Sequence, residues 1–177
     1  GASAVSVLTE PYWFLGSNEY LKEIRKNISI PILRKDFTVD DYMIYEAKVI
    51  GADAVLLICT ITENDVLKHR IELAKSLGLS SLVEAHSEEE IQAAIDAGAE
   101  IIGVNNRNLK DFSVDVSLSA KFRKEVPENI LFVAESGIKT VQQVRDLESD
   151  GVNAVLVGET LMRASDRVKA VRDFCGR

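Results

Sequence analysis

The stretch Gly51-Ala-Asp-Ala-Val-Leu-Leu57 decides the fold, because close variants of it occur three more times in the chain. The variants begin at Gly1, Gly98 and Gly151, so the spacings are 50, 47 and 53 residues. Each glycine suits the left-handed residue that ends a helix, and each β-branched run after it suits a strand buried on both faces. The repeat therefore predicts four buried strands at a nearly constant interval.

Three further apolar runs lie midway between these strands and predict three more, at 30–35, 79–84 and 130–135. The segments between strands have helical periodicity. The predicted helices are 39–50, 63–77, 88–97, 118–126, 140–149 and 166–174. Ser87 with Glu90 has the pattern of a capping box, and Thr140 is a second start signal. Alternating strands and helices with continuously apolar strands predict a parallel α/β fold.

Two architectures fit this alternation, an open doubly wound sheet and a (βα)8 barrel of the TIM-barrel type. A unit of roughly 25 residues with a twofold-coarser repeat favours the barrel, in which odd and even strands fill alternate interior layers. The glycine-led strands form the even set, and only three odd strands lie between them. We therefore expect strands two to eight of a barrel, in a single domain over 1–177 that lacks the first βα unit.

Polar side chains end several of the predicted strands. In the run Pro31-Ile-Leu-Arg-Lys-Asp-Phe37, alternation places Leu33 and Lys35 on one face of the strand. The same parity gives three more inward polar residues at strand ends, namely Glu84, Asn105 and Glu135. Such groups are costly to bury without mutual pairing, and barrel chemistry lies at the carboxyl ends of the strands. An acid/base site is the favoured interpretation, and a purely stabilising polar layer is the alternative.

Desolvation lowers the pKa of a buried lysine, and nearby carboxylates restore it. In either case Lys35 can serve as a catalytic acid.

Two glycine turns, 135–138 and 157–160, follow the last predicted strands. Backbone N–H groups in such turns bind phosphate, and barrels commonly place a phosphate after strands seven and eight. The two turns together predict a phosphorylated substrate.

Four other features are weaker candidates. His86 either lines the site or decorates a loop, and we favour the loop. His69 lies in a charged helical segment and is expected to be solvated. Glu10, at a strand end, is a further candidate for the polar site. Tyr12-Trp13-Phe14 is either a lid over an aromatic substrate or a hydrophobic staple into the next helix.

The composition is that of one ordinary soluble domain, with 177 residues, 46% hydrophobic and 28% charged. The net charge of −7 without a basic run argues against nucleic acid or an anionic membrane as partner. No membrane span and no secretory leader is visible, so we predict a cytoplasmic protein. Cys59 and Cys175 predict reduced thiols, and no metal-ligand spacing or nucleotide-binding glycine motif is present.

Six motifs, in order along the whole chain, resemble the indole-3-glycerol phosphate synthase family. They are S-V-L-T-E-P, I-L-R-K-D-F, L-V-E-A-H, G-V-N-N-R-N-L, V-A-E-S-G-I and V-L-V-G-E-T-L-M. The resemblance implies a (βα)8 barrel with an extra N-terminal helix. It also implies the ring closure of 1-(2-carboxyphenylamino)-1-deoxyribulose 5-phosphate, with loss of carbon dioxide and water, in tryptophan biosynthesis. It implies neither cofactor nor metal.

The resemblance also implies roles for individual residues. Lys35 would be a general acid for the ribulose carbonyl and Glu84 a proton-transfer carboxylate. Asn105, Arg107 and Glu135 would position the substrate. The aromatic pocket would be lined by Leu8, Phe37, Leu56 and Leu156, and the phosphate would contact Ser136, Gly137, Gly158 and the N–H of Glu159.

The chain departs from the family in two respects. The first strand, which carries another catalytic Glu and Lys, is absent, as is the N-terminal helix. Some relatives have a small hydroxyl residue where Glu159 stands, so its carboxylate is expected to point away from the phosphate. Two other functions remain open: a non-catalytic or assembly fragment that self-associates through open strand edges, and a different phosphate-binding barrel such as a sugar-phosphate isomerase, which needs other acid/base residues.

Overall fold

A computed structural model describes residues 1–107 and 113–176, and in these ranges seven strands alternate with helices. The strands are β1 (Val5–Leu8), β2 (Ile32–Lys35), β3 (Ala54–Ile58), β4 (Ser80–Ala85), β5 (Ile101–Asn105), β6 (Leu131–Glu135) and β7 (Ala154–Leu156). The helices are α1 (Asn18–Asn27), α2 (Asp41–Ile50), the 3-10 turn η1 (Cys59–Ile61), α3 (Asn64–Ser76), α4 (Glu88–Asp96), α5 (Ser117–Arg123), α6 (Val141–Ser149), α7 (Glu159–Arg163) and α8 (Arg167–Phe174). All seven predicted strands are confirmed.

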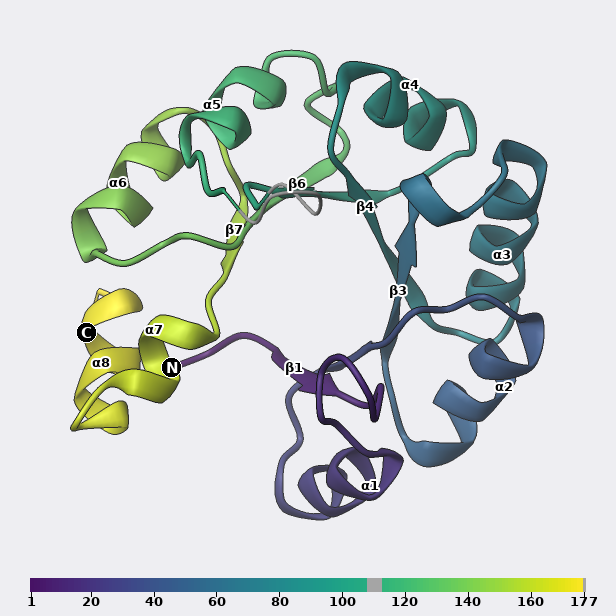
Figure 1. Cartoon of the computed structure of the whole chain (residues 1–177), viewed down its shortest axis with the longest axis horizontal. Helices are drawn as coiled ribbons and strands as arrows, with labels where there is room; N and C mark the ends of the chain where they lie inside the picture. Colours follow the sequence, from purple (N-terminus) through teal and green to yellow (C-terminus); the bar gives the residue numbers. More distant parts are fainter. Residues whose placement is uncertain (108–112, 177) are drawn as a thin grey trace.

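The strands form one parallel sheet in chain order, β1 to β7. Figure 1 shows the sheet curling around an open centre with the helices on its outer side. In the described part of the chain β1 and β7 are the two sheet edges and do not pair with each other. The structure is therefore a curled seven-stranded parallel sheet and not a closed eight-stranded barrel.

Glycines end the helices before three of the strands, as the repeat predicts. Gly51, Gly98 and Gly151 have φ values of 96°, 85° and 84°, which glycine adopts without steric cost. At Gly51 the backbone N–H also donates to the carbonyls of Ala47 and Lys48 at the end of α2. The repeated glycine therefore marks the point where each helix reverses toward the next strand.

Two apolar layers lie on opposite faces of the sheet. The outer layer, between strands and helices, contains Ile32, Val55 and Val83. The inner layer, inside the curl, is Leu33, Leu56, Ile58 and Leu82, with Phe37, Val133 and Leu156 packed against it. This alternation confirms the predicted parity, which assigns Leu33 and Lys35 to the interior of the curl.

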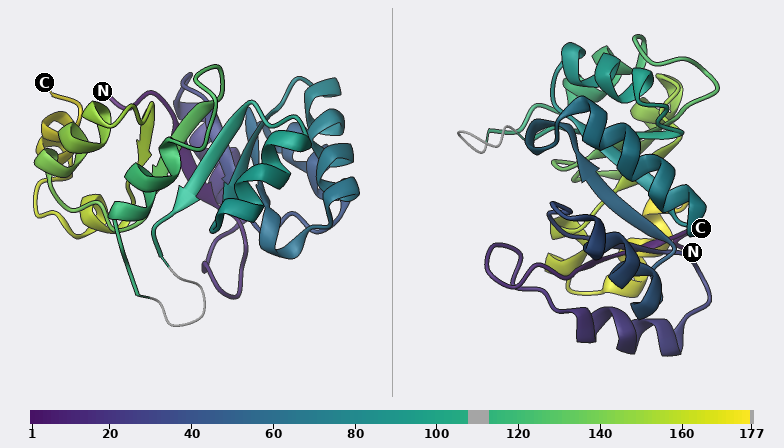
Figure 2. Two further views of the ribbon diagram at one scale, coloured as in Figure 1. Left: turned by 90° about the horizontal axis from the view of Figure 1, so that it is seen from above. Right: turned by 90° about the vertical axis from the view of Figure 1, so that its right-hand side faces the viewer.

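Two α-helices, and the 3-10 turn η1, were not predicted. Helix α1 is held by its N-cap Ser17, whose side chain accepts from the Glu19 N–H, and it fully buries only Leu21. Helix α7 has five residues, too few for a helical period to show in sequence. Figure 2 shows that the two termini lie near each other and that the loop after β1 protrudes from one end of the molecule.

None of the described helices is long and apolar enough to cross a membrane.

Cys59 is buried, and Cys175 is exposed; both are free thiols. Burial, with smaller contributions from the charges of Glu90 and Glu84, raises the pKa of the Cys59 thiol to about 12. Cys59 is thus an unreactive packing residue at neutral pH.

Candidate active site

Four predicted polar side chains meet inside the curl, at the carboxyl ends of their strands. Lys35 Nζ donates to Glu135 Oε2 at 3.1 Å and to Glu84 Oε2 at 3.2 Å. Asn105 Nδ2 donates to Glu84 Oε1 at 3.2 Å, and Asn105 Oδ1 accepts the Arg107 N–H. The side chains of Glu84 and Glu135 are almost completely buried, whereas Lys35 retains slight exposure. The cluster is therefore sheltered, with one ammonium shared by two carboxylates.

The curl of the sheet is what brings these residues together. Lys35 ends β2 and Glu135 ends β6, four strands away in the sheet order. Four spacings of about 4.8 Å would separate the two strands by roughly 19 Å in a flat sheet. Because the sheet curls, both side chains instead point into the interior of the curl, where they form a hydrogen bond.

The two carboxylates have opposite pKa shifts although both contact Lys35. Burial raises the pKa of Glu84, but the contact with His86, the Lys35 charge and the Asn105 hydrogen bond outweigh burial and lower it. Burial raises the pKa of Glu135 to about 7, because Lys35 only partly offsets it and the charge of Glu84 adds to it. Neighbouring groups with opposed shifts are typical of acid/base sites.

The Lys35 ammonium remains charged. Burial alone would lower its pKa, but the charges and hydrogen bonds of Glu135 and Glu84 outweigh burial, so the pKa is raised. Of the two outcomes expected for a buried lysine, a lowered pKa or one that nearby carboxylates restore, the structure has the second. A charged, partly accessible ammonium can donate a proton or a hydrogen bond to a substrate oxygen.

Gly103 creates the space that Glu135 occupies. It lies on β5 directly opposite Val133, and a Cβ atom on it would overlap Glu135 Oε1. That oxygen is buried and has no hydrogen-bond partner among the described residues. A buried carboxylate oxygen without a donor is costly. Glu135 Oε1 can therefore accept a proton, or a hydrogen bond from a donor on a bound molecule.

His86 lines this cluster, so the favoured assignment of His86 to loop decoration is wrong. Its Nε2 lies 3.3 Å from Glu84 Oε1, and its Nδ1 lies 3.4 Å from Glu90 Oε2. The contact with Glu84 falls outside hydrogen-bond geometry and is an ion pair. His69, by contrast, is exposed on α3 as expected, where it contacts Asp41 at 2.8 Å.

Glu10 does not join the polar cluster, contrary to the hypothesis from its place in the sequence. Its carboxylate accepts the backbone N–H groups of Tyr12, Trp13 and Phe14. Tyr12 and Trp13 remain more than 80% exposed, so neither forms a hydrophobic staple. Phe14 instead packs against Phe37, with the ring centroids 4.8 Å apart and the ring planes tilted by 33°.

The other predicted pocket residues differ in their exposure. Leu8 is 41% exposed and Leu156 is half-buried, whereas Leu56 is fully buried in the inner apolar layer. Phe37 is half-buried at the end of the same layer. Phe14 was not among the predicted pocket residues, and its contact with Phe37 adds it to this apolar wall.

The two glycine turns are tied together at the same end of the sheet. Ser136 and Gly137 have left-handed φ values of 66° and 75°. Thr160 Oγ1 donates to the Ile138 carbonyl at 2.7 Å, which links α7 to the loop after β6. The buried Asn106 donates to the Ser136 carbonyl, so the loop after β5 also supports this turn. Gly158 is exposed, and a methyl group placed on it would meet no atom within 4 Å.

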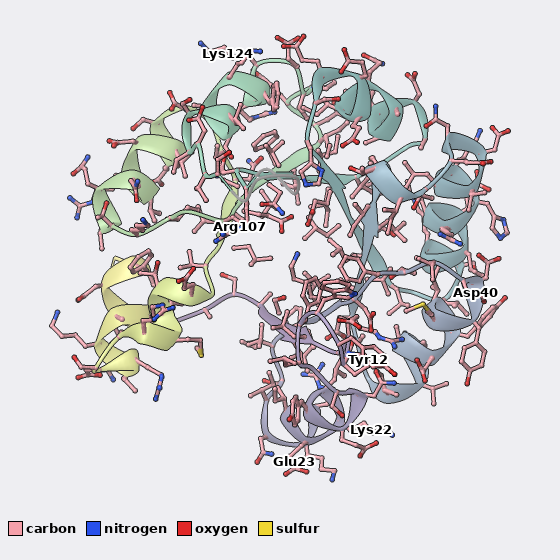
Figure 3. The ribbon with its side chains drawn as sticks, in the orientation of Figure 1. Tyr12, Lys22, Glu23, Asp40, Arg107 and Lys124 are labelled. Atoms are coloured by element: carbon pink, nitrogen blue, oxygen red, sulfur yellow. The ribbon has the colours of Figure 1, made fainter. Side chains whose placement is uncertain are left out.

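Arg107 and Glu159 face each other across this end of the sheet. Figure 3 shows Arg107 pointing into the space inside the curl, whereas the labelled Lys22, Glu23, Asp40 and Lys124 lie on the outer rim. Arg107 Nη2 lies 3.6 Å from Glu159 Oε2, and Arg163 Nε donates to Glu159 Oε1 at 2.9 Å. The Glu159 carboxylate therefore lies between two arginines.

Within residues 1–107 and 113–176, no three His, Cys, Asp or Glu side chains are grouped so that they could hold a metal ion. The chemistry that the described cluster can perform is proton donation by an ammonium and proton exchange with two unequal carboxylates.

Fold and site together define a parallel α/β protein with ionisable side chains buried at the carboxyl ends of a curled sheet. Solved structures with this fold include 3-hexulose-6-phosphate synthase from Salmonella typhimurium, with a TM-score of 0.84, 19% identity, and 99% and 85% of the two chains covered. KGPDC from Streptococcus mutans has a TM-score of 0.75 and 16% identity, with 97% and 83% covered. At these identities the likeness concerns the fold alone.

Sequence comparison is more specific. The family model for indole-3-glycerol phosphate synthase matches residues 1–174. An indole-3-glycerol phosphate synthase from Ruminiclostridium cellulolyticum is 59% identical over 166 residues, which are 94% of this chain and 64% of the relative. One from Endomicrobium trichonymphae is 57% identical over 98% of this chain and 67% of the relative. The chain belongs to the indole-3-glycerol phosphate synthase family and spans about two thirds of the length of these relatives.

Proposed function

We propose that the protein containing this chain is an indole-3-glycerol phosphate synthase, a carbon-carbon lyase of tryptophan biosynthesis. It would convert 1-(2-carboxyphenylamino)-1-deoxyribulose 5-phosphate into indole-3-glycerol phosphate, carbon dioxide and water. The observation that carries this proposal is the sharing of the Lys35 ammonium by Glu84 and Glu135. Those residues occupy strand ends in a chain that belongs to the family.

Lys35 would act as the general acid. As the aromatic carbon that bears the carboxylate bonds to the ribulose carbonyl carbon, the carbonyl oxygen needs a proton or a hydrogen bond, which the charged ammonium supplies. Cleavage of the bond to the carboxylate then releases carbon dioxide and restores the aromatic ring. The ammonium is suited to this step because its pKa is raised, by the charges and hydrogen bonds of Glu135 and Glu84, despite burial.

The last step removes the new hydroxyl as water together with a proton from the adjacent carbon or nitrogen. Glu84, whose pKa is lowered, is the carboxylate that would be free to take part in this proton transfer. Glu135 and Asn105 would position the substrate, with the unpaired Oε1 of Glu135 as an acceptor for a substrate hydroxyl or N–H. These roles follow the family resemblance, and the geometry is compatible with each.

The substrate's phosphate would lie between the turns at Ser136-Gly137 and Gly158-Glu159, beside Arg107. Support comes from the left-handed Ser136 and Gly137 and from the link between Thr160 and Ile138. Leu8, Phe37, Leu56 and Leu156 would form the aromatic pocket. The complete burial of Leu56 favours a role in supporting the pocket floor, while Phe14 adds a ring next to Phe37.

For the fold, we propose strands two to eight of a (βα)8 barrel, with a further βα unit completing the gap between β1 and β7. The family membership and the curl of the sheet support this reading. The unpaired sheet edges also favour the second candidate, in which this chain alone is an inactive assembly fragment. A cytoplasmic location and the lack of a nucleic-acid partner stay predictions from composition.

A chimera tests the proposed function. This chain would replace the matching 166 residues of the Ruminiclostridium cellulolyticum relative, so that the relative supplies the rest of its length. Formation of indole-3-glycerol phosphate would be followed by its fluorescence. We expect turnover in the chimera and none after Lys35→Met. A folded chimera that binds but does not convert the substrate would contradict the proposal.

A further inference from the structure

We propose that His86, held in place by Glu90 and Thr60, is a positioning residue that orients the Glu84 carboxylate toward Lys35 and supplies a fixed positive charge on its far side. This inference rests on the proposed function for its catalytic meaning. The contacts behind it are made by His86 in the loop between β4 and α4, Glu90 in the first turn of α4 and Thr60 in η1.

Glu84 lies between two cations. Its Oε2 accepts from Lys35 Nζ at 3.2 Å, and its Oε1 lies 3.3 Å from His86 Nε2. The amide of Asn105 also donates to Oε1, at 3.2 Å. Glu135 has only the shared ammonium and an Oε1 without a partner in the described ranges. His86 and Asn105, which contact Glu84 and not Glu135, thus make the two carboxylates unequal.

The imidazole is held from behind by Glu90. The Glu90 carboxylate accepts the His86 backbone N–H at 2.7 Å, and its Oε2 lies 3.4 Å from His86 Nδ1. Its other oxygen accepts the Thr60 hydroxyl at 2.8 Å, and Thr60 Oγ1 lies 3.3 Å from His86 Nδ1. Glu90 is in the first turn of α4, where the helix favours a negative charge.

Only half of the expected capping box forms, which leaves the Glu90 carboxylate free for this contact. In such a box the glutamate would accept the N–H of the N-cap residue, here Ser87. The Ser87 half is confirmed, because its side chain accepts the Glu90 N–H. The Glu90 carboxylate accepts the N–H of His86 instead. The helix start is therefore adapted to hold the histidine.

The charges around His86 favour a fixed cation over a proton shuttle. Burial would lower the pKa of His86, but its contacts with Glu84 and Glu90 outweigh burial and raise it to about 9. The ionisable groups around the Glu84 and His86 pair are Lys35 on β2, Glu135 on β6, Glu90 on α4 and Cys59 on η1. A group that stays protonated at neutral pH holds charge but does not exchange protons readily.

The first test needs no turnover. A histidine-selective ¹H,¹³C NMR titration of the chimera follows the ring signals of the two histidines of this chain, which His69→Gln and His86→Gln assign. We expect His86 to titrate well above the ordinary pKa of about 6.5, and both Glu84→Gln and Glu90→Gln to lower its midpoint. A His86 midpoint near the ordinary value that Glu84→Gln does not move would overturn the proposal.

The second test links the contact to catalysis, in the chimera described above. His86→Gln should move the acid limb of the kcat/KM profile up by about one pH unit or more, the effect of losing one nearby positive charge. His86→Lys should restore part of this shift, and the matched surface change His69→Gln should leave the profile unchanged. Thr60→Val and Glu90→Gln give the same readout should His86→Gln fail to fold.

The two tests separate the inference from the proposed function. An inactive chimera with an unchanged NMR coupling would remove the proposed function but leave the electrostatic coupling of His86 to Glu84 in place. An active chimera whose acid limb is moved neither by His86→Gln nor by Glu90→Gln would show that His86 does not position Glu84.

Discussion

The Lys35 ammonium lies 3.1 Å from Oε2 of Glu135, a residue one hundred positions later in the chain. Glu135 is buried, its other oxygen has no partner in the described part of the chain, and its pKa is raised, by burial above all. Removing Lys35 would leave Glu84 and Glu135 facing each other without the shared cation. Because the raised pKa allows Glu135 to take up a proton, the fold can tolerate that loss.

Lys35→Met should therefore abolish turnover in the chimera and leave the fold intact. The loss of a positioned acid typically costs about 10² to 10⁴ in rate. The measurement is kcat with circular dichroism as a check of folding, and Lys124→Met on the outer rim is the matched control. A Lys35→Met protein with more than about a tenth of the normal kcat would remove Lys35 from the mechanism.

Gly103→Ala should displace the Glu135 carboxylate. The added methyl would overlap Glu135 Oε1 and lie 3.1 Å from Leu82 Cδ1, so the carboxylate must shift from the position in which it binds Lys35. We expect a lower kcat and a lower free energy of unfolding, measured by urea denaturation. Gly158→Ala is the control for stability, since its methyl meets no atom within 4 Å. Equal stabilities of the two variants would contradict the close packing at Gly103.

Gly158→Val should raise KM strongly without changing the unfolding midpoint. The side chain has room in the ligand-free chain, but it would block the close approach of a phosphate to the backbone. Gly137→Val, unlike Gly158→Val, should lower the free energy of unfolding as well as raise KM. Gly137 has φ of 75°, and a Cβ there would overlap Val114 Cγ1. An unchanged KM for Gly158→Val would place the phosphate elsewhere.

Strand parity was enough to predict which polar residues meet. Alternation along a strand is a local property, so the inward positions of Lys35, Glu84, Asn105 and Glu135 could be read from sequence. The curl that unites them could be inferred from the repeat. How many strands the chain contributes also followed from the repeat, because every buried strand is a distinct apolar run.

The residues that sequence missed depend on three-dimensional contacts. His86 is outside any strand, and its role arises because Glu90 holds the ring from the next helix. Gly103 matters only because Glu135, on the neighbouring strand, fills the space above it. Glu10 was misassigned because its carboxylate turns back to three N–H groups of its own loop. None of these contacts has a periodic signature.

The free energy of unfolding should be largest in mildly acidic solution. The pKa of Glu84 is lowered to about 2, so its contribution is present above its ordinary pKa of 4.5 and is lost as the pH falls toward 2. The pKa of Glu135 is raised from 4.5 to about 7 and that of His86 from 6.5 to about 9. Their contributions are present below the ordinary values and are lost as the pH rises through the raised ones.

Urea unfolding of the chimera, with and without His86→Gln, at several pH values checks this prediction. We expect the free energy of unfolding to decrease between pH 6.5 and about 9, and His86→Gln to flatten that decrease. His69→Gln, an exposed change of the same kind, should leave the slope unaltered. A slope between these pH values that is the same in His86→Gln and in the unaltered chain would mean that the two glutamates do not hold His86 in its protonated form.

The chain purified alone should be nearly inactive and should self-associate. Strands β1 and β7 are the edges of a curled parallel sheet, and each presents backbone N–H and C=O groups that no described strand satisfies. Closing seven strands into a barrel would require a change of tilt and stagger together. Pairing of the edges with a second chain therefore costs less than closure.

The resemblance also implies that a further Glu and Lys take part in catalysis, and this sequence does not contain the strand that carries them in the family. Their loss could cost several orders of magnitude in kcat. Sedimentation velocity and the fluorescence assay on the 177-residue chain measure both expectations. A stable monomer that turns over at roughly 1 s⁻¹ or more would contradict them, and would mean that the cluster of Lys35, Glu84 and Glu135 suffices for the reaction.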